Sequence, residues 1–152
     1  MGMAKRNKKR EQGAGSGTLR GLPPSLPPLE MAYRLQERAA GVGFDWPDAR
    51  GPMEKVKEEV AELERETLKD SLTVAGKGTR ERVEEEVADL LFAVVNLARK
   101  LGIDPEAALA RANDKFTRRF EGVERLARER GLELGRASLE ELDRLWEEVK
   151  RR

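Results

Sequence analysis

The chain has 152 residues, of which 30 are basic and 29 acidic, and it contains neither histidine nor cysteine. The absence of these two residue types excludes Ser-His-Asp and Cys-His nucleophilic sites, disulfides and iron–sulfur clusters. It also excludes haem held by an axial histidine and zinc held by nitrogen and sulfur. Carboxylate oxygens remain as metal ligands, and they suit hard divalent cations such as Mg²⁺, Mn²⁺ and Ca²⁺.

The near-zero net charge conceals an uneven distribution. Residues 1–20 carry six basic groups and one acidic group, whereas the other 132 residues carry 24 basic and 28 acidic groups. We interpret residues 1–28 as a basic, Pro-rich leader that we expect to be disordered, and residues 29–152 as one domain. Within the leader, residues 5–10 either contact nucleic acid or serve only as a solubilising tail.

No apolar run approaches the length needed to span a bilayer, and no apolar segment follows the basic N-terminus as in a signal peptide. We therefore expect a soluble protein of the cytoplasm that has no membrane partner.

The pattern beyond the leader is helical almost throughout, and no stretch alternates in the manner of a strand. Glycine, proline and capping residues divide it into an all-α, antiparallel bundle of about five helices. Predicted helices cover residues 29–40, 52–70, 79–101 and 105–130, and a fifth helix opens at residue 138. Thr79 is the expected N-cap of the third helix, residues 76–78 are an expected loop, and residues 138–141 form an expected capping box.

Two consecutive helices place pairs of acids beside an apolar stripe. In the helix over 52–70, Glu59 and Glu62 flank the stripe, whereas Glu58 falls on the solvent side. In the helix over 79–101, Glu86 and Asp89 lie on one edge of the stripe. The two stripes consist of Met53, Val56, Val60 and Leu63, and of Val83, Val87, Leu90, Val94, Leu97 and Leu101.

An antiparallel pairing of these two helices brings the four carboxylates together. Converging carboxylates repel one another and acquire raised pKa values unless a cation neutralises them. Mg²⁺ suits such a site because it takes oxygen ligands and adds substrate phosphates to its coordination shell. The alternative is an ordinary solvated helix face on which the acids pair with nearby Lys and Arg residues.

A basic pair lies on the predicted helix over 105–130. Lys115 and Arg119 share a face at a spacing of four residues, next to Phe116 and Phe120, which we interpret as core residues. If the two cations face the four carboxylates across the bundle, they would hold phosphate. The alternative is that they are part of an ordinary helix surface.

The order of these motifs resembles the MazG-type all-α nucleoside triphosphate pyrophosphohydrolases. Residues 55–62, followed by residues 86–89, are similar to the EExxE and ExxD signature of that family. Further likeness extends over residues 34–46, 89–99, 112–120 and 138–150. The resemblance therefore covers about residues 26–151.

The resemblance implies Mg²⁺-dependent hydrolysis of nucleoside triphosphates to the monophosphate and pyrophosphate, with Mn²⁺ as a substitute metal. The metal ligands and catalytic residues that it implies are Glu59, Glu62, Glu86 and Asp89. The nucleotide-binding positions are Lys55, Glu58, Arg82 and Glu85, with Lys115 and Arg119 at phosphate and Trp146 at the base. Trp46 is either a second aromatic wall or a hydrophobic anchor for its loop.

Family members are homodimers or larger, so we expect a homodimer or homotetramer that takes part in housecleaning of the nucleotide pool. Two-domain relatives carry a second copy of the unit, whereas this chain has one.

Two other functions stay open. One is a related hydrolase of narrower substrate range, of the dUTP or phosphoribosyl-ATP type. The other is a non-enzymatic helical interaction module that binds nucleic acid through residues 5–10.

Overall fold

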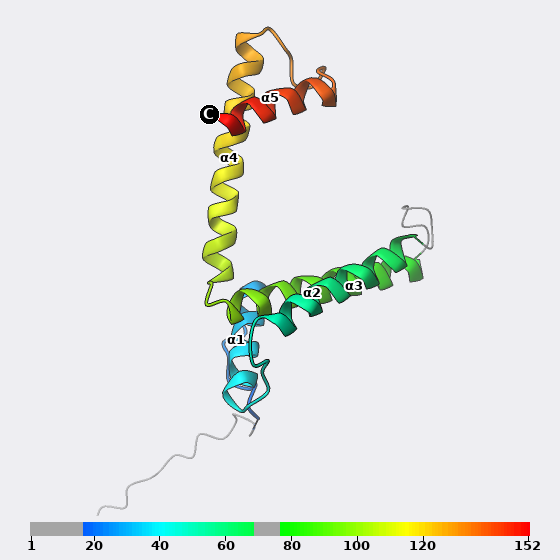
Figure 1. Cartoon of the computed structure of the whole chain (residues 1–152), viewed down its shortest axis with the longest axis vertical. Coiled ribbons are helices and arrows are strands. Elements are labelled where there is room, and N and C mark those ends of the chain that lie inside the picture. Colours follow the sequence, from blue (N-terminus) through cyan, green and yellow to red (C-terminus); the bar gives the residue numbers. More distant parts are fainter. Residues whose placement is uncertain (1–16, 69–76) are drawn as a thin grey trace, which may run out of the picture. The chain divides into compact units, whose positions relative to one another are not determined.

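The computed structural model describes residues 17–68 and 77–152 (Figure 1). Within these ranges it contains five helices and no strand, which confirms the prediction of an all-helical fold. The helices are α1 (Pro28–Gly41), α2 (Arg50–Leu68), α3 (Lys77–Lys100), α4 (Pro105–Glu129) and α5 (Leu139–Arg151). The basic residues 5–10 and most of the loop between α2 and α3 lie outside the described residues.

The chain separates into two compact units, Met1–Pro105 and Glu106–Arg152. In the first unit, α1 and α2 both pack against α3, and Figure 1 shows α2 and α3 side by side along their length. Side-chain contacts connect these helices. The Gln36 Nε2 of α1 donates to the Phe92 carbonyl oxygen of α3 at 2.9 Å. The Arg82 guanidinium of α3 pairs with Glu66 of α2 at 3.3 Å.

The turn between α1 and α2 is held to the C-terminal end of α3 by charge. Asp45 accepts hydrogen bonds from the side chains of Arg99 and Lys100, the latter at 3.0 Å. Its carboxylate also accepts from the backbone N–H of Trp46 at 2.8 Å. These donors, with Arg99 the largest influence, hold the pKa of Asp45 well below its usual range. The turn therefore has a fixed attachment to the helix that carries Glu86 and Asp89.

Helices α2 and α3 each begin two residues earlier than predicted. Asp48 explains the start of α2, because its Oδ1 accepts from the Arg50 N–H at 2.9 Å and Pro52 then falls within the first turn. The prediction of Thr79 as the N-cap of α3 is wrong, because Lys77 and Gly78 are already helical. First-turn residues need no intrahelical partner for their N–H groups, so Gly78 is tolerated there.

The second unit contains α4 and α5, which pack through a small apolar core (Figure 1). Val123, Leu126, Ala127 and Leu145 are buried, and Leu142, Trp146 and Val149 pack against them. A Cβ at Gly122 would lie 3.1 Å from the Val149 methyl groups, so this glycine permits the close approach of α5. The Ser138 hydroxyl and the Glu141 side chain form the predicted capping box at the start of α5.

Several positions predicted to be apolar core are exposed. Phe116 and Phe120 of α4 are 58% and 42% exposed, although their rings stack at a centroid distance of 5.9 Å. On α2, Met53 and Val60 are exposed, whereas Glu59 is buried. The reason is that α3 packs on the flank of the α2 stripe that carries Glu59.

None of the helices in the described ranges is long and apolar enough to cross a membrane.

We predict that Asp45→Asn weakens the first unit in a pH-dependent manner. The pKa of Asp45 is lowered in the folded chain, so its ion pairs stabilise the fold above the ordinary pKa of 3.8 and this contribution is lost as the pH falls below that value. At pH 7 the variant should lose about 2 kcal/mol in urea denaturation. This difference should shrink below about pH 4.

Asp143→Asn, which changes an exposed carboxylate of α5, is the control and should leave stability within about 0.5 kcal/mol of the unmodified chain. An equal loss of stability for Asp45→Asn at neutral and acidic pH would contradict the ion-pair account.

Candidate active site

Three carboxylates from α2 and α3 converge on one point. Glu59 of α2 and the Glu86 and Asp89 side chains of α3 each present an oxygen, and these oxygens all lie within 4.8 Å of one another. Glu59 is only 6% exposed, Glu86 is half-buried and Asp89 is exposed. The spacing of three residues between Glu86 and Asp89 puts both on the face of α3 that meets α2.

Glu62, the fourth acid expected here, is turned toward its own helix. Its carboxylate pairs with the Arg65 guanidinium one turn further along α2. Glu62 remains close enough to repel Glu86, whose pKa is raised mainly by burial and then by the negative charges of Glu62, Glu59 and Asp89. The site thus holds an excess of negative charge around Glu86.

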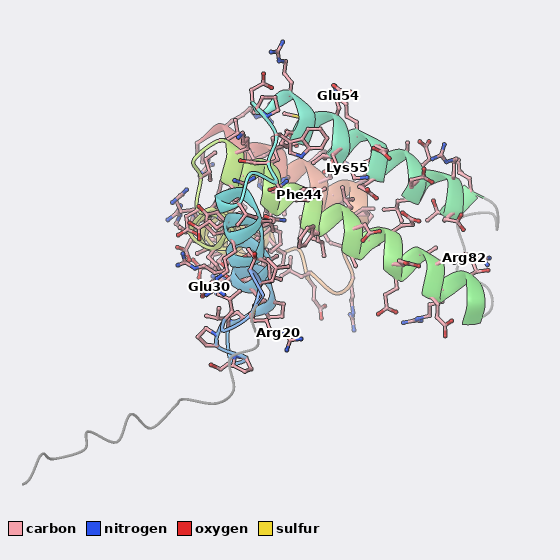
Figure 2. The ribbon with its side chains drawn as sticks, turned by 90° about the horizontal axis from the view of Figure 1, so that it is seen from below. Arg20, Glu30, Phe44, Glu54, Lys55 and Arg82 are labelled. Carbon is pink, nitrogen blue, oxygen red and sulfur yellow. The ribbon has the colours of Figure 1, made fainter. Side chains whose placement is uncertain are left out.

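Lys55 supplies the cation nearest to the buried acid. Its Nζ lies 2.6 Å from Glu59 Oε1 and 3.4 Å from Glu58 Oε1. Figure 2 shows Lys55 on the side of α2 toward α3, and Glu54 on the outer side. The hydrogen bond to Glu59 raises the pKa of Lys55, so the ammonium stays charged at neutral pH. The ammonium therefore offsets part of the charge of the three acids.

The other predicted nucleotide-binding residues of the first unit lie at the edge of this cluster. Arg82 is paired with Glu66, Glu58 is 60% exposed beside Lys55, and Glu85 is exposed on α3. The predicted phosphate-binding and base-binding residues, Lys115, Arg119 and Trp146, belong to the second unit. There Trp146 lies against Phe116 at a centroid distance of 5.5 Å. The proximity of these three residues to the acids stays a prediction.

A pocket of about 340 Å³ opens beside the acids. It is lined by Trp46, Lys55, Glu59, Asp89, Phe92, Ala93 and Asn96. The pocket combines two carboxylates and an ammonium with the aromatic rings of Trp46 and Phe92. It is therefore suited to a ligand that has both a charged part and an apolar part.

Trp46 is held in this pocket by a glycine. A Cβ placed on Gly51 would lie 2.3 Å from the Trp46 ring, so the indole packs directly on the backbone at the start of α2. The sequence left two roles open for Trp46, and the contact shows that the ring is packed on α2 while it also lines the pocket.

Sequence reasoning did not select Gln36, Asp45 or Asn96 as site residues. Gln36 could have been found, because it lies on the side of its helix occupied by Ala32, Ala39 and Ala40, where a polar residue is unexpected. The link between Asp45 and the end of α3 spans more than 50 residues, and no local pattern predicts it.

Comparison with known proteins shows what this chain is similar to. Residues 51–123 match the family described as the MazG nucleotide pyrophosphohydrolase domain. This part of the chain is similar to a MazG domain. The matched range contains all of Glu59, Glu62, Glu86 and Asp89, together with Lys115 and Arg119, whereas Trp46 and Trp146 fall outside it.

Curated relatives extend the likeness over most of the chain. A protein of Escherichia coli (strain K12) named nucleoside triphosphate pyrophosphohydrolase is 43% identical over 146 residues, which is 96% of this chain and 53% of the relative. A Thermotoga maritima protein named nucleoside triphosphate pyrophosphohydrolase/pyrophosphatase MazG is 46% identical over 127 residues, 84% of this chain and 46% of the relative. The chain thus spans about half the length of the curated relatives that it matches.

We predict that Gly51→Ala disturbs the packing of Trp46 on the start of α2. Alanine normally favours a helix over glycine by about 1 kcal/mol, but here its methyl group would overlap the indole ring. The variant should therefore lose about 1–3 kcal/mol of stability and change the near-ultraviolet circular dichroism of the tryptophans.

Gly41→Ala is the matched control, because a Cβ at the end of α1 meets nothing within 4 Å. If Gly51→Ala is as stable as Gly41→Ala and has an unchanged aromatic spectrum, then Trp46 does not pack on Gly51.

Proposed function

We propose that this MazG-like domain hydrolyses nucleoside triphosphates to the nucleoside monophosphate and pyrophosphate with the help of Mg²⁺, for which Mn²⁺ can substitute. The observation that carries the proposal is the convergence of Glu59, Glu86 and Asp89 within 4.8 Å. The names of the relatives, which cover nearly the whole chain at 43–46% identity, support the same activity.

The residues present fit a hard divalent cation. All the converging donors are carboxylate oxygens, and the chain has no histidine or cysteine to favour a softer metal. Burial, followed by the negative charges of Glu62, Glu59 and Asp89, raises the pKa of Glu86, and a bound cation would offset these charges. We propose Glu59, Glu86 and Asp89 as ligands, joined by Glu62 when it leaves Arg65.

When bound, Mg²⁺ supplies positive charge to phosphate oxygens and lowers the pKa of a water molecule. Hydrolysis adds water to the phosphorus atom of the nucleotide from which pyrophosphate leaves. Lys55 is placed to donate a hydrogen bond to a phosphate oxygen, because its Nζ already lies at the mouth of the acid cluster. Glu58 lies beside Lys55, and we propose that Glu58, Arg82 and Glu85 contact the nucleotide.

Three residues of the second unit have side chains of the kinds that bind nucleotides, and we propose that they contact the substrate. Lys115 and Arg119 provide cationic donors for the triphosphate, and Trp146 provides an aromatic face for the base. Charge on the phosphate oxygens changes during hydrolysis, and fixed cations such as Lys115 and Arg119 stabilise that change.

We also propose that the helices complete their bundle as a homodimer or homotetramer, with α2 and α3 antiparallel. The pairing of Arg82, near the start of α3, with Glu66, near the end of α2, supports the antiparallel order. Exposed apolar side chains support self-association, because Leu91, Val94 and Val60 remain open to solvent on these helices. We propose that residues 29–152 form the catalytic domain and that residues 1–28 form the leader. The role that we propose for the domain is housecleaning of nucleotides in the cytoplasm.

We predict that Glu59→Gln and Asp89→Asn each lower Mg²⁺-dependent pyrophosphate release at least 100-fold. Each substitution keeps the shape of the side chain but removes one negative charge from the acid cluster. The assay follows pyrophosphate release from a panel of common and modified nucleoside triphosphates, and far-ultraviolet circular dichroism checks that helix content is unchanged.

Glu54→Gln is the control, because Glu54 is exposed on the same helix and pairs with Lys57. It should keep at least half of the activity of the unmodified chain. Full activity in both Glu59→Gln and Asp89→Asn would rule out the proposed site.

We predict that Lys55→Met strengthens metal binding in the absence of nucleotide. The Lys55 ammonium and a divalent cation compete for the same Glu59 carboxylate, so removing the ammonium should raise the affinity for Mn²⁺ about tenfold. Electron paramagnetic resonance of free Mn²⁺ measures this affinity without any catalytic step.

Lys57→Met removes the same charge from an exposed position where the partner is Glu54, and should change the affinity less than twofold. Equal or weaker binding of Mn²⁺ by Lys55→Met would show that Lys55 does not compete with the metal.

A further inference from the structure

A second and larger pocket adjoins the acid site within the first unit. Its volume is about 610 Å³, which is within the usual range for small-molecule sites. It shares Trp46, Phe92 and Asn96 with the pocket that contains Glu59 and Asp89. The remaining wall residues are Leu19, Leu35, Gln36, Ala39, Gly43, Phe44, Asp45 and Arg99. A ligand whose charged end lies at the acids can therefore extend into the larger pocket.

Aromatic side chains with open faces form much of this pocket. Trp46 is 44% exposed, and Phe92 and Phe44 are exposed as well. Figure 2 shows Phe44 on the turn that connects α1 to α2. Aromatic rings of this kind stack well on a planar heterocycle. Gly51 and Asp45 hold the Trp46 segment against α2 and α3, so the wall is in place without a ligand.

The charged groups of the pocket are already paired with one another. The Arg99 guanidinium donates to Asp45 and to the Asn96 side-chain oxygen, the latter at 2.9 Å. Lys100 also donates to Asp45. Asp45 thus already engages both the Arg99 guanidinium and the Lys100 ammonium at this end of the site. The pocket therefore suits an uncharged ring rather than further phosphate groups.

One polar atom of the pocket lining is left without a partner. Gln36 is 7% exposed, and its Oε1 is the buried side-chain polar atom that lacks a hydrogen bond in the described part of the chain. The Phe92 carbonyl oxygen accepts from Gln36 Nε2 at 2.9 Å, and this contact fixes which end of the amide is the donor. The remaining oxygen can only accept, so its natural partner is an N–H group.

We propose that this pocket binds the nucleobase of the substrate and that Gln36 Oε1 accepts a hydrogen bond from an N–H group of the base. The inference rests on the proposed hydrolysis of nucleotides, and it makes Gln36 a specificity-determining residue. The aromatic walls accept any base, whereas the Gln36 oxygen favours bases that present an N–H donor. A base without such a donor would leave the oxygen unpaired.

The first experiment compares matched substrates on the unmodified chain with Mg²⁺. ATP is paired with purine riboside triphosphate, and CTP with pyrimidin-2-one riboside triphosphate, because each analogue lacks the N–H donor of its parent base. For whichever of ATP and CTP is the better substrate, we expect kcat/KM to be about ten times that of its analogue. The difference should lie mainly in KM, since the base is remote from the reacting phosphorus. Equal kcat/KM values for parent and analogue would overturn the inference.

The second experiment repeats the comparison on Gln36→Met, which keeps the side-chain volume but has no amide oxygen. The parent nucleotide should lose about tenfold in kcat/KM, whereas the analogue should stay within about twofold. Leu35→Met, a neighbouring change in the same wall, should preserve the preference for the parent. A preference that survives in Gln36→Met would overturn the role of Gln36.

The two proposals fail in different ways. If the unmodified chain releases no pyrophosphate from any nucleotide, then the proposed hydrolysis is wrong. If it releases pyrophosphate without regard to the N–H donor, then hydrolysis stands and base recognition by Gln36 does not.

Discussion

The packing of α2 against α3 is the constraint on which the rest of this structure depends. It brings Glu59 to the same point as Glu86 and Asp89, although these like charges repel one another. Lys55 relieves part of the repulsion from a distance of 2.6 Å, and a divalent cation would relieve it more fully. The chemistry of the proposed site therefore accounts for the burial of Glu59 between α2 and α3.

The elements around this helix pair connect the acids to an apolar pocket. Asp45 ties the turn after α1 to the end of α3, and Gly51 lets Trp46 pack on the start of α2. Trp46 and Phe92 then line both the pocket with the acids and the larger pocket that contains Gln36. The first unit thus presents a charged end and an aromatic end side by side, which matches the two ends of a nucleotide.

Local signals in the sequence were sufficient for the helices and for three of the four acids expected to converge, whereas Glu62 pairs with Arg65 instead. The five helices follow from apolar periodicity, from Gly102 and Gly131 with positive φ, and from the capping box at Ser138. The burial of each face depends on tertiary packing, so the periodicity of α2 predicted burial for Met53 although α3 covers Glu59 instead. Contacts between distant residues, such as Gln36 with Phe92, have no local signature.

The most direct test of the account is a crystal structure of the full chain with Mn²⁺, in which anomalous scattering locates the metal. We expect a peak bounded by the carboxylates of Glu59, Glu86 and Asp89, with the Lys55 ammonium moved away from Glu59. A peak at another group of acids, or no peak while Lys55 remains on Glu59 at saturating Mn²⁺, would contradict the central claim that these three acids hold the metal.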